Sequence, residues 1–212
     1  MTTKLSIFNS ALLECGERNL ASLTEAREPR RLLDAVWDNG ALDFCLNAGQ
    51  WKFATRSTML ERSPSITPAF GYQNAYEIPS DFIRTVAFCA DEYFNSPITQ
   101  YSTEAGFWFS DVEPVYVKYV SNDASYGADM SLWPQNFARY VEAYLASRII
   151  ERLSQNETKW GNLFKLTERR LLEAKATDAM EGSTKFAPTG SWVRSRSGSF
   201  GGIRHSQNKL IG

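Results

Sequence analysis

The chain opens with apolar residues at helical spacing. In KLSIFNSALLECG, one side of the predicted helix carries Leu5, Phe8, Leu12 and Cys15, and Gly16 follows as a usual helix terminator. A second helical pattern, EPRRLLDAVWDNGALDFCLNAG, has a proline that a first turn tolerates and a glycine just past its end. One side of this helix is expected to carry Leu33, Val36, Trp37, Gly40, Phe44 and Ala48. We therefore predict an antiparallel pair of helices over about 4–16 and 28–48.

The repeat of apolar positions then changes from the helical period to a period of two. WKFATRSTML alternates like a strand, and FIRTVAF, FWF and PVYVKYV are rich in β-branched and aromatic residues. These segments predict a small β-rich region over about 51–120. A Ser/Pro-rich loop interrupts this region at 62–73, and two roles stay open for it: contact between subunits or docking of a downstream protein.

Helical periodicity returns in WPQNFARYVEAYLASRIIERLS and in NETKWGNLFKLTERRLLEAKATDAMEG, which predict helices over about 134–154 and 157–180. The second of these presents a face made of Trp160, Leu163, Phe164, Leu171 and Ala174. The expected fold class is α+β and mainly helical: a four-helix bundle with an inserted small β-rich region and an extended C-terminal tail. Residues 1–182 form one domain in this prediction, and residues 183–212 form the basic, Gly/Ser-rich tail.

The formal net charge of −1 hides a strong asymmetry. From Ser183 onward the chain carries five basic residues and no acidic one, which leaves 18 Lys/Arg against 24 Asp/Glu, a net charge of −6, in residues 1–182. The overall composition, 43% hydrophobic and 22% charged, is typical of a folded protein. We therefore expect an acidic folded body followed by a basic tail.

The three cysteines, Cys15, Cys45 and Cys89, are odd in number, widely spaced and embedded in apolar patterns. This arrangement predicts free buried thiols in a reducing compartment rather than a disulfide framework.

The N-terminal sequence does not follow the pattern of a signal peptide, and no window approaches the roughly 18 consecutive apolar residues of a membrane span. The prediction is a soluble protein made in the cytosol.

The sequence contains few candidates for catalysis. It has no P-loop, GxGxxG, GxSxG, HExxH or CxxC motif, and its only histidine, His205, lies in the tail. Two pairs of acidic residues lie about one helical turn apart: Asp34 with Asp38, and Asp178 with Glu181. Such pairs could act in acid-base catalysis or bind a metal, but they usually mark a solvated helix face. We predict that the protein is not an enzyme and holds no cofactor or metal, and we keep a metal-dependent enzyme using Asp34 and Asp38 as a rival.

Aromatic residues gather on the predicted strands, where nucleic-acid bases could stack. The residues concerned are Phe107, Trp108, Phe109, Tyr116 and Tyr119. A stacking surface needs basic charge to hold the phosphate backbone, and residues 101–120 offer only Lys118 against three acidic side chains. A role in the core or in a protein interface is the favoured interpretation.

The order of these features resembles the head-to-tail adaptor proteins of tailed bacteriophages, particularly the tail tubular protein A family of short-tailed phages. The resemblance rests on the helix ending in CGER, the spacer LASLTEA, the W-x-F strand, and the two C-terminal helical patterns. YEIPSDFIRTVAF matches a family pattern through Tyr76, Ile78, Pro79, Asp81 and Arg84. The resemblance covers about residues 5–182 and leaves out the loop at 63–72 and the tail.

The resemblance implies a structural virion protein at the head-tail junction, present in the host cytoplasm during assembly. It implies a homo-oligomeric ring, expected to be a dodecamer, that docks below the portal protein and above a nozzle or other tail protein. DNA would pass through the channel without specific binding, and an acidic wall would repel its phosphates.

The tail then has an expected role in docking on the portal. A segment this rich in Gly and Ser does not fold alone, yet it carries spaced anchors for a partner groove and arginines for a partner's carboxylates. The predicted portal-binding residues are Trp192, Val193, Arg194, Arg196, Phe200, Ile203 and Arg204. Two alternatives stay open: a merely solvated C-terminus, and a nucleic-acid-binding protein that holds phosphates with its basic tail.

Overall fold

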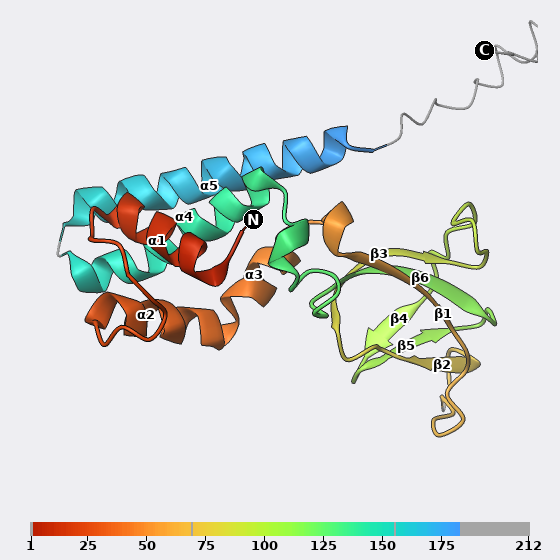
Figure 1. The fold of residues 1–212 in the computed structure, drawn as a ribbon. Helices are drawn as coiled ribbons and strands as arrows, with labels where there is room; N and C mark the ends of the chain where they lie inside the picture. The colour runs from red at the N-terminus through yellow and green to blue at the C-terminus, as the bar shows by residue number, and fades with distance from the viewer. Residues whose placement is uncertain (1, 69, 155, 183–212) are drawn as a thin grey trace, which may run out of the picture. The chain divides into compact units, whose positions relative to one another are not determined.

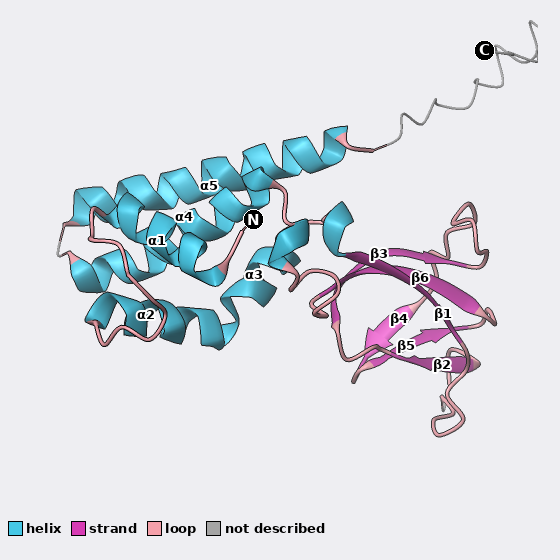
Figure 2. Ribbon diagram, in the orientation of Figure 1, coloured by secondary structure: helices cyan, strands magenta, loops and turns pink. Residues whose placement is uncertain are grey.

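The computed structural model of the protein describes residues 2–68, 70–154 and 156–182 (Figures 1 and 2). The α-helices in these ranges are α1 (Lys4–Cys15), α2 (Glu28–Val36), α3 (Leu42–Asn47), α4 (Gln135–Leu153) and α5 (Glu157–Met180). The strands are β1 (Thr55–Leu60), β2 (Asn74–Glu77), β3 (Phe82–Cys89), β4 (Ser102–Glu104), β5 (Phe107–Ser110) and β6 (Val115–Ser121). Met1–Met180 form one compact unit.

Local sequence explains both ends of α1. Thr3 caps its N-terminus by accepting a hydrogen bond from the backbone N–H of Ser6, whose hydroxyl accepts in return from the backbone N–H of Thr3. At the other end Gly16 adopts φ +76°, and its N–H donates to the carbonyl of Leu13 at 3.0 Å. Glycine enters this left-handed conformation without a steric penalty, so the helix stops where the sequence predicts.

The expected four-helix bundle is wrong. The predicted helix over 28–48 is interrupted, because Asn39 leaves helical geometry and Gly40 adopts φ +82°. The two halves, α2 and α3, are therefore separate elements. The fold is α+β, with 45% of the described residues helical and 18% in strands, and the strands form two three-stranded antiparallel sheets rather than a minor insertion.

The two sheets have the strand orders β1-β6-β3 and β2-β5-β4, with antiparallel pairing throughout. β6 is the central strand of the first sheet, because both β1 and β3 pair with it. Thr55 of β1 lies opposite Val120, and Cys89 of β3 lies opposite Tyr116. The buried side chains of this region form their own cluster: Tyr76, Phe88, Trp108, Val115, Val117 and Tyr119. The β region therefore contains a hydrophobic core of its own.

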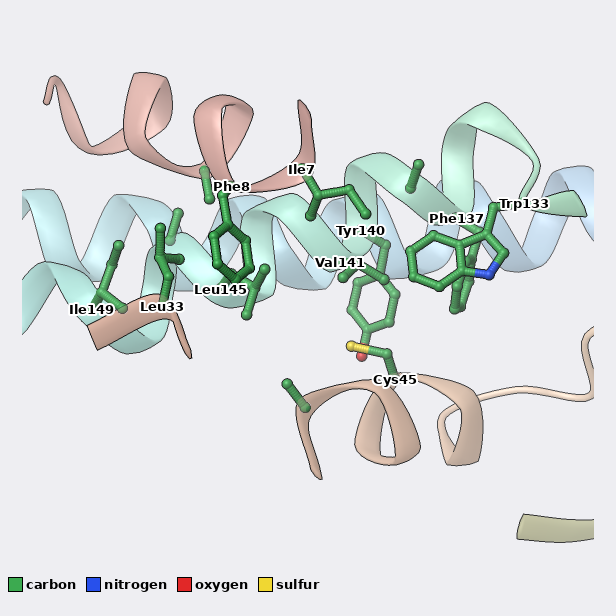
Figure 3. Packing of buried hydrophobic residues seen from close by; sticks show 14 of the residues in the cluster. Ile7, Phe8, Leu33, Cys45, Trp133, Phe137, Tyr140, Val141, Leu145 and Ile149 are labelled. Carbon is green, nitrogen blue, oxygen red and sulfur yellow. The ribbon is translucent and has the colours of Figure 1, made fainter. Parts of the chain in front are cut away.

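The larger core surrounds α4. Figure 3 shows Phe8 of α1, Leu33 of α2 and Cys45 of α3 directed toward this helix. The residues of α4 that meet them recur at helical spacing: Phe137, Tyr140, Val141, Leu145 and Ile149. Buried residues therefore lie around most of the circumference of α4, as expected for a helix that packs against several others.

All three cysteines are buried and free, as the sequence predicts. Burial raises the pKa of Cys15 to about 11, so its thiol stays protonated at neutral pH. Burial likewise raises the pKa of Cys45, which lies beside Tyr140 in Figure 3. These thiols therefore behave as small apolar core residues.

Lys52 links the start of the β region to the end of α5. Its backbone N–H donates to the carboxylate of Asp178 at 2.9 Å, and its ammonium donates to the carbonyl oxygens of Asp178 and Ala179. A cation is favourable at the negative end of a helix, where the last carbonyls lack partners within the helix. This contact fixes the last turn of α5.

Candidate interaction surface

An open groove of about 510 Å³ lies between α3, α4 and α5. Its apolar wall contains two stacked aromatic pairs: Phe44 on Tyr144, with ring centroids 4.8 Å apart, and Trp160 on Phe164, at 5.8 Å. Phe44, Trp160 and Phe164 keep 58%, 46% and 50% of their surface exposed. We call this surface the aromatic groove.

The positions of these residues along their helices explain why the rings lie outside the core. Trp160 and Phe164 are four residues apart and so share one face of α5, while Leu163 is buried beside α1 and α4. Phe44 belongs to α3, which the break at Gly40 separates from α2. The sequence predicts Phe44 on the same side as Leu33, and the structure instead leaves Phe44 exposed and buries Leu33.

The charged residues along the groove are mostly acidic once the neighbouring hollow is included. Glu168 lines the aromatic groove, and a second hollow that shares Trp160 is lined by Glu151 and Glu157. Among the described residues that line either hollow, Arg148 is the only basic one. Exposed aromatic side chains with a charged rim are typical of protein contact surfaces.

Two of the five β-strand aromatic residues considered for base stacking belong to the core. Trp108 and Tyr119 are buried, so their rings offer no face for a base to stack on. Phe107, Phe109 and Tyr116 are only partly exposed. The interpretation as core is confirmed for Trp108 and Tyr119.

Residues of the YEIPSDFIRTVAF motif serve as structural anchors. The Asp81 carboxylate accepts hydrogen bonds from Arg56 at 2.9 Å, from the Tyr119 hydroxyl at 3.0 Å and from Ser121 at 2.5 Å. Two further polar residues of the motif donate to backbone carbonyls: Tyr76 to that of Val112 and Arg84 to that of Asn47. Tyr76, Asp81 and Arg84 of this motif therefore connect separate segments of the fold.

The acid-base behaviour of Asp81 follows from these contacts. Burial raises the pKa of Asp81, but the hydrogen bonds from Ser121, Arg56 and Tyr119 outweigh it and hold the pKa below the ordinary value of 3.8. A carboxyl whose pKa falls on folding stabilises the native state above its unfolded pKa. This contribution is lost as the pH falls through the depressed value.

We predict that Asp81→Asn lowers the free energy of unfolding by about 2–3 kcal/mol at pH 7, because hydrogen bonds to the carboxylate weaken and the ion pair is lost. The difference from the parent protein should shrink below pH 4. Urea denaturation at pH 7 and at pH 3 measures both effects, with the exposed Glu92→Gln as control. An Asp81→Asn variant as stable as the parent at pH 7 would contradict the anchoring role.

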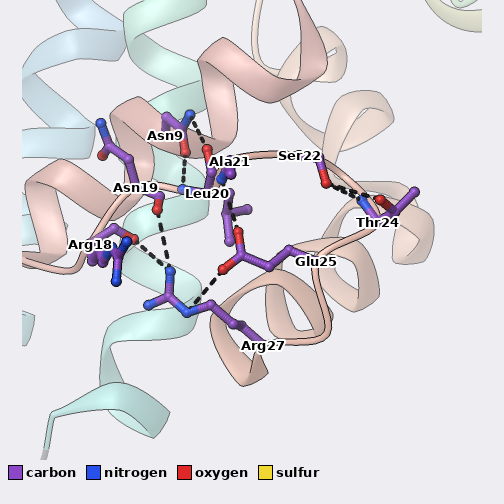
Figure 4. Close-up of polar contacts among 9 residues, drawn as sticks. All are labelled: Asn9, Arg18, Asn19, Leu20, Ala21, Ser22, Thr24, Glu25 and Arg27. Carbon is purple, nitrogen blue, oxygen red and sulfur yellow. Dashed lines mark hydrogen bonds and ion pairs between the residues drawn. The ribbon is translucent and has the colours of Figure 1, made fainter.

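The LASLTEA spacer also has a structural role (Figure 4). The side-chain amide of Asn9 accepts from the N–H of Leu20 at 2.7 Å and donates to its carbonyl at 3.1 Å. The Arg27 guanidinium donates to the carbonyls of Arg18 and Asn19, and lies 3.7 Å from Glu25. These contacts hold the connection between α1 and α2 against α1.

The carboxylates considered for a metal site have other contacts. Asp34 forms ion pairs with Lys4 at 3.3 Å and with Arg30 at 2.5 Å, while Asp38 is exposed. Asp178 binds Lys52 at the end of α5. Within residues 2–68, 70–154 and 156–182, no cluster of three His, Cys, Asp or Glu side chains could hold a metal ion.

The predicted portal-binding residues, Trp192 to Arg204, and His205 lie outside the described residues. The groove is the feature that sequence reasoning missed, because periodicity assigned Phe44, Trp160 and Phe164 to apolar helix faces without showing which faces stay uncovered.

Across the described part of the chain, no helix is both long and apolar enough to cross a membrane.

Comparison with known proteins gives no assignment. No protein-family model matches the sequence, and no characterised protein is significantly similar to it.

Proposed function

We propose that the protein is a head-to-tail adaptor, a structural virion protein that forms a ring between the portal and the tail or nozzle. The observation that carries the proposal is the aromatic groove, because three large side chains about half exposed on one face of the described helices favour a protein partner. The order of sequence elements, which resembles that of the phage adaptors, supplies the kind of partner.

The acidic body suits a channel wall. Residues 1–182 carry a net charge of −6, and a ring multiplies this excess by its number of copies. A negative wall repels DNA phosphates, so DNA slides through without adhering. In this proposal the chain contributes shape, charge and protein contacts, and no catalysis.

The C-terminal tail docks on the portal in this proposal. Its arginines pair with carboxylates and its aromatic residues fill apolar pockets, and many tails on one ring bind together through a high effective concentration. We predict that Trp192→Ala combined with Phe200→Ala weakens portal binding at least about tenfold per tail, as expected for loss of two aromatic anchors.

Surface plasmon resonance on an immobilised cognate portal ring measures this effect, with Ser195→Ala combined with Ser197→Ala as a control that leaves the anchors intact. Equal binding by the parent and the double aromatic variant would remove the tail from the docking role.

The five basic residues of the tail favour a second candidate, a nucleic-acid-binding protein. Phosphate binding of this kind weakens steeply with salt. Filter binding of duplex DNA at low and physiological salt separates the two functions. An adaptor should retain little DNA in either condition, whereas tight binding that salt abolishes would favour the second candidate.

A further inference from the structure

The aromatic groove has the features of a site for an aromatic and basic peptide. Its wall offers the stacked pairs Phe44–Tyr144 and Trp160–Phe164, so a third ring can pack against either pair. Glu168 and Arg148 line the same surface, and Glu151 and Glu157 line the hollow that shares Trp160, so the acidic residues outnumber the basic one by three to one. A peptide that suits this surface carries apolar anchors and several positive charges.

The C-terminal stretch 189–204 of this chain has that composition. It contains Trp192 and Phe200 as anchors, arginines at 194, 196 and 204, and no acidic residue. Arginine suits such a surface because its guanidinium pairs with carboxylates in two hydrogen bonds and also stacks on aromatic rings. The charge and the aromatic content of the stretch therefore complement those of the groove.

We propose that the aromatic groove of one copy binds residues 189–204 of a second copy. Trp192 is the tenth residue after Gly182, and an extended chain of ten residues spans about 35 Å, which is enough to reach a neighbouring molecule. Each copy has one groove and one tail, so the contact is head-to-tail and closes into a ring when the rotation between copies permits. Gly and Ser residues around the anchors let the stretch follow the surface.

This contact does not depend on the portal function and stands or falls by itself. Where the portal is also present, the same anchors cannot fill both sites, so groove and portal compete for them. A ring could then exchange groove contacts for portal contacts as it docks.

The first test titrates full-length protein into a fluorescently labelled synthetic peptide of residues 189–204 and follows anisotropy. Trp160→Ala combined with Phe164→Ala should lower the affinity at least about tenfold. Glu168→Lys should lower it several-fold and reduce its dependence on salt. Leu172→Ala removes an exposed apolar side chain of α5 that does not line the groove, and should leave the affinity unchanged.

The second test assigns the peptide to another copy. Sedimentation equilibrium of the full-length chain should show association that rises with concentration. The same association should disappear in the groove variant Trp160→Ala/Phe164→Ala and in the tail variant Trp192→Ala/Phe200→Ala.

Three results would overturn the proposal: peptide affinity unchanged by the groove variant, a full-length chain that stays monomeric at all concentrations, or association that survives loss of the tail anchors. Portal binding of the same variants is measured separately. A chain that docks on the portal without binding the peptide refutes only the groove contact, and the reverse result refutes only the portal function.

Discussion

Replacing Trp51 by alanine is expected to lower the free energy of unfolding by about 3–5 kcal/mol, the usual cost of removing a buried tryptophan. Trp51 is 1% exposed, and its ring centroid lies 4.9 Å from that of Phe137. Its indole N–H donates to the carbonyl of Cys45 at 3.1 Å. The substitution thus leaves a cavity beside α4 and a buried carbonyl without its donor.

Urea denaturation followed by circular dichroism measures this loss. Trp160→Ala is the matched control, because Trp160 is 46% exposed and its removal should cost about 1 kcal/mol or less. Similar losses for the two variants would show that Trp51 does not hold the core as described.

Gly127→Ala is expected to cost more than about 2 kcal/mol, because the new methyl group has no space. A Cβ at this position would lie 2.3 Å from the backbone oxygen of Ser121 and 2.8 Å from Leu46. That oxygen accepts the N–H of Gly127 at 3.1 Å, and the carbonyl of Gly127 accepts the indole N–H of Trp133 at 2.8 Å. Relieving the clash therefore disturbs two hydrogen bonds of the turn before α4.

Gly161→Ala provides the opposite case. Gly161 lies inside α5, and apart from its chain neighbours and the nearby backbone of α5 itself, an added Cβ meets no described atom within 4 Å. Alanine should stabilise this helix by about 0.5–1 kcal/mol relative to glycine. Thermal unfolding of the two variants should give shifts of opposite sign, and a destabilised Gly161→Ala variant would contradict this account of α5.

Several elements could be predicted from local sequence because local chemistry determines them. The apolar repeat before Gly16 and the repeat around Tyr140 lie in the observed α1 and α4, since helical burial requires that spacing. The alternation in PVYVKYV lies in β6, which is buried on alternate residues over most of its length.

The break between α2 and α3 was not predictable from the apolar pattern. Glycine is tolerated inside a helix at a small loss of stability, and it also fits a left-handed turn. The packing around Gly40 selects the left-handed conformation. The pairing of six short strands into two sheets depends likewise on contacts far apart in sequence, such as Arg56 with Asp81.

The candidate site was hidden for a related reason. Trp160 and Phe164 have the spacing of core residues, and only the tertiary structure shows that no described element covers them. The basic tail, in contrast, is evident from composition alone, because charges can be counted without a fold.

Native mass spectrometry of this protein mixed with its cognate portal ring tests the adaptor function most directly. The account predicts that the full-length chain adds to the portal in a fixed multiple and that a chain ending at Gly182 does not. Failure of both chains to bind the portal would contradict the adaptor function, and equal binding by both would contradict the docking role of the tail.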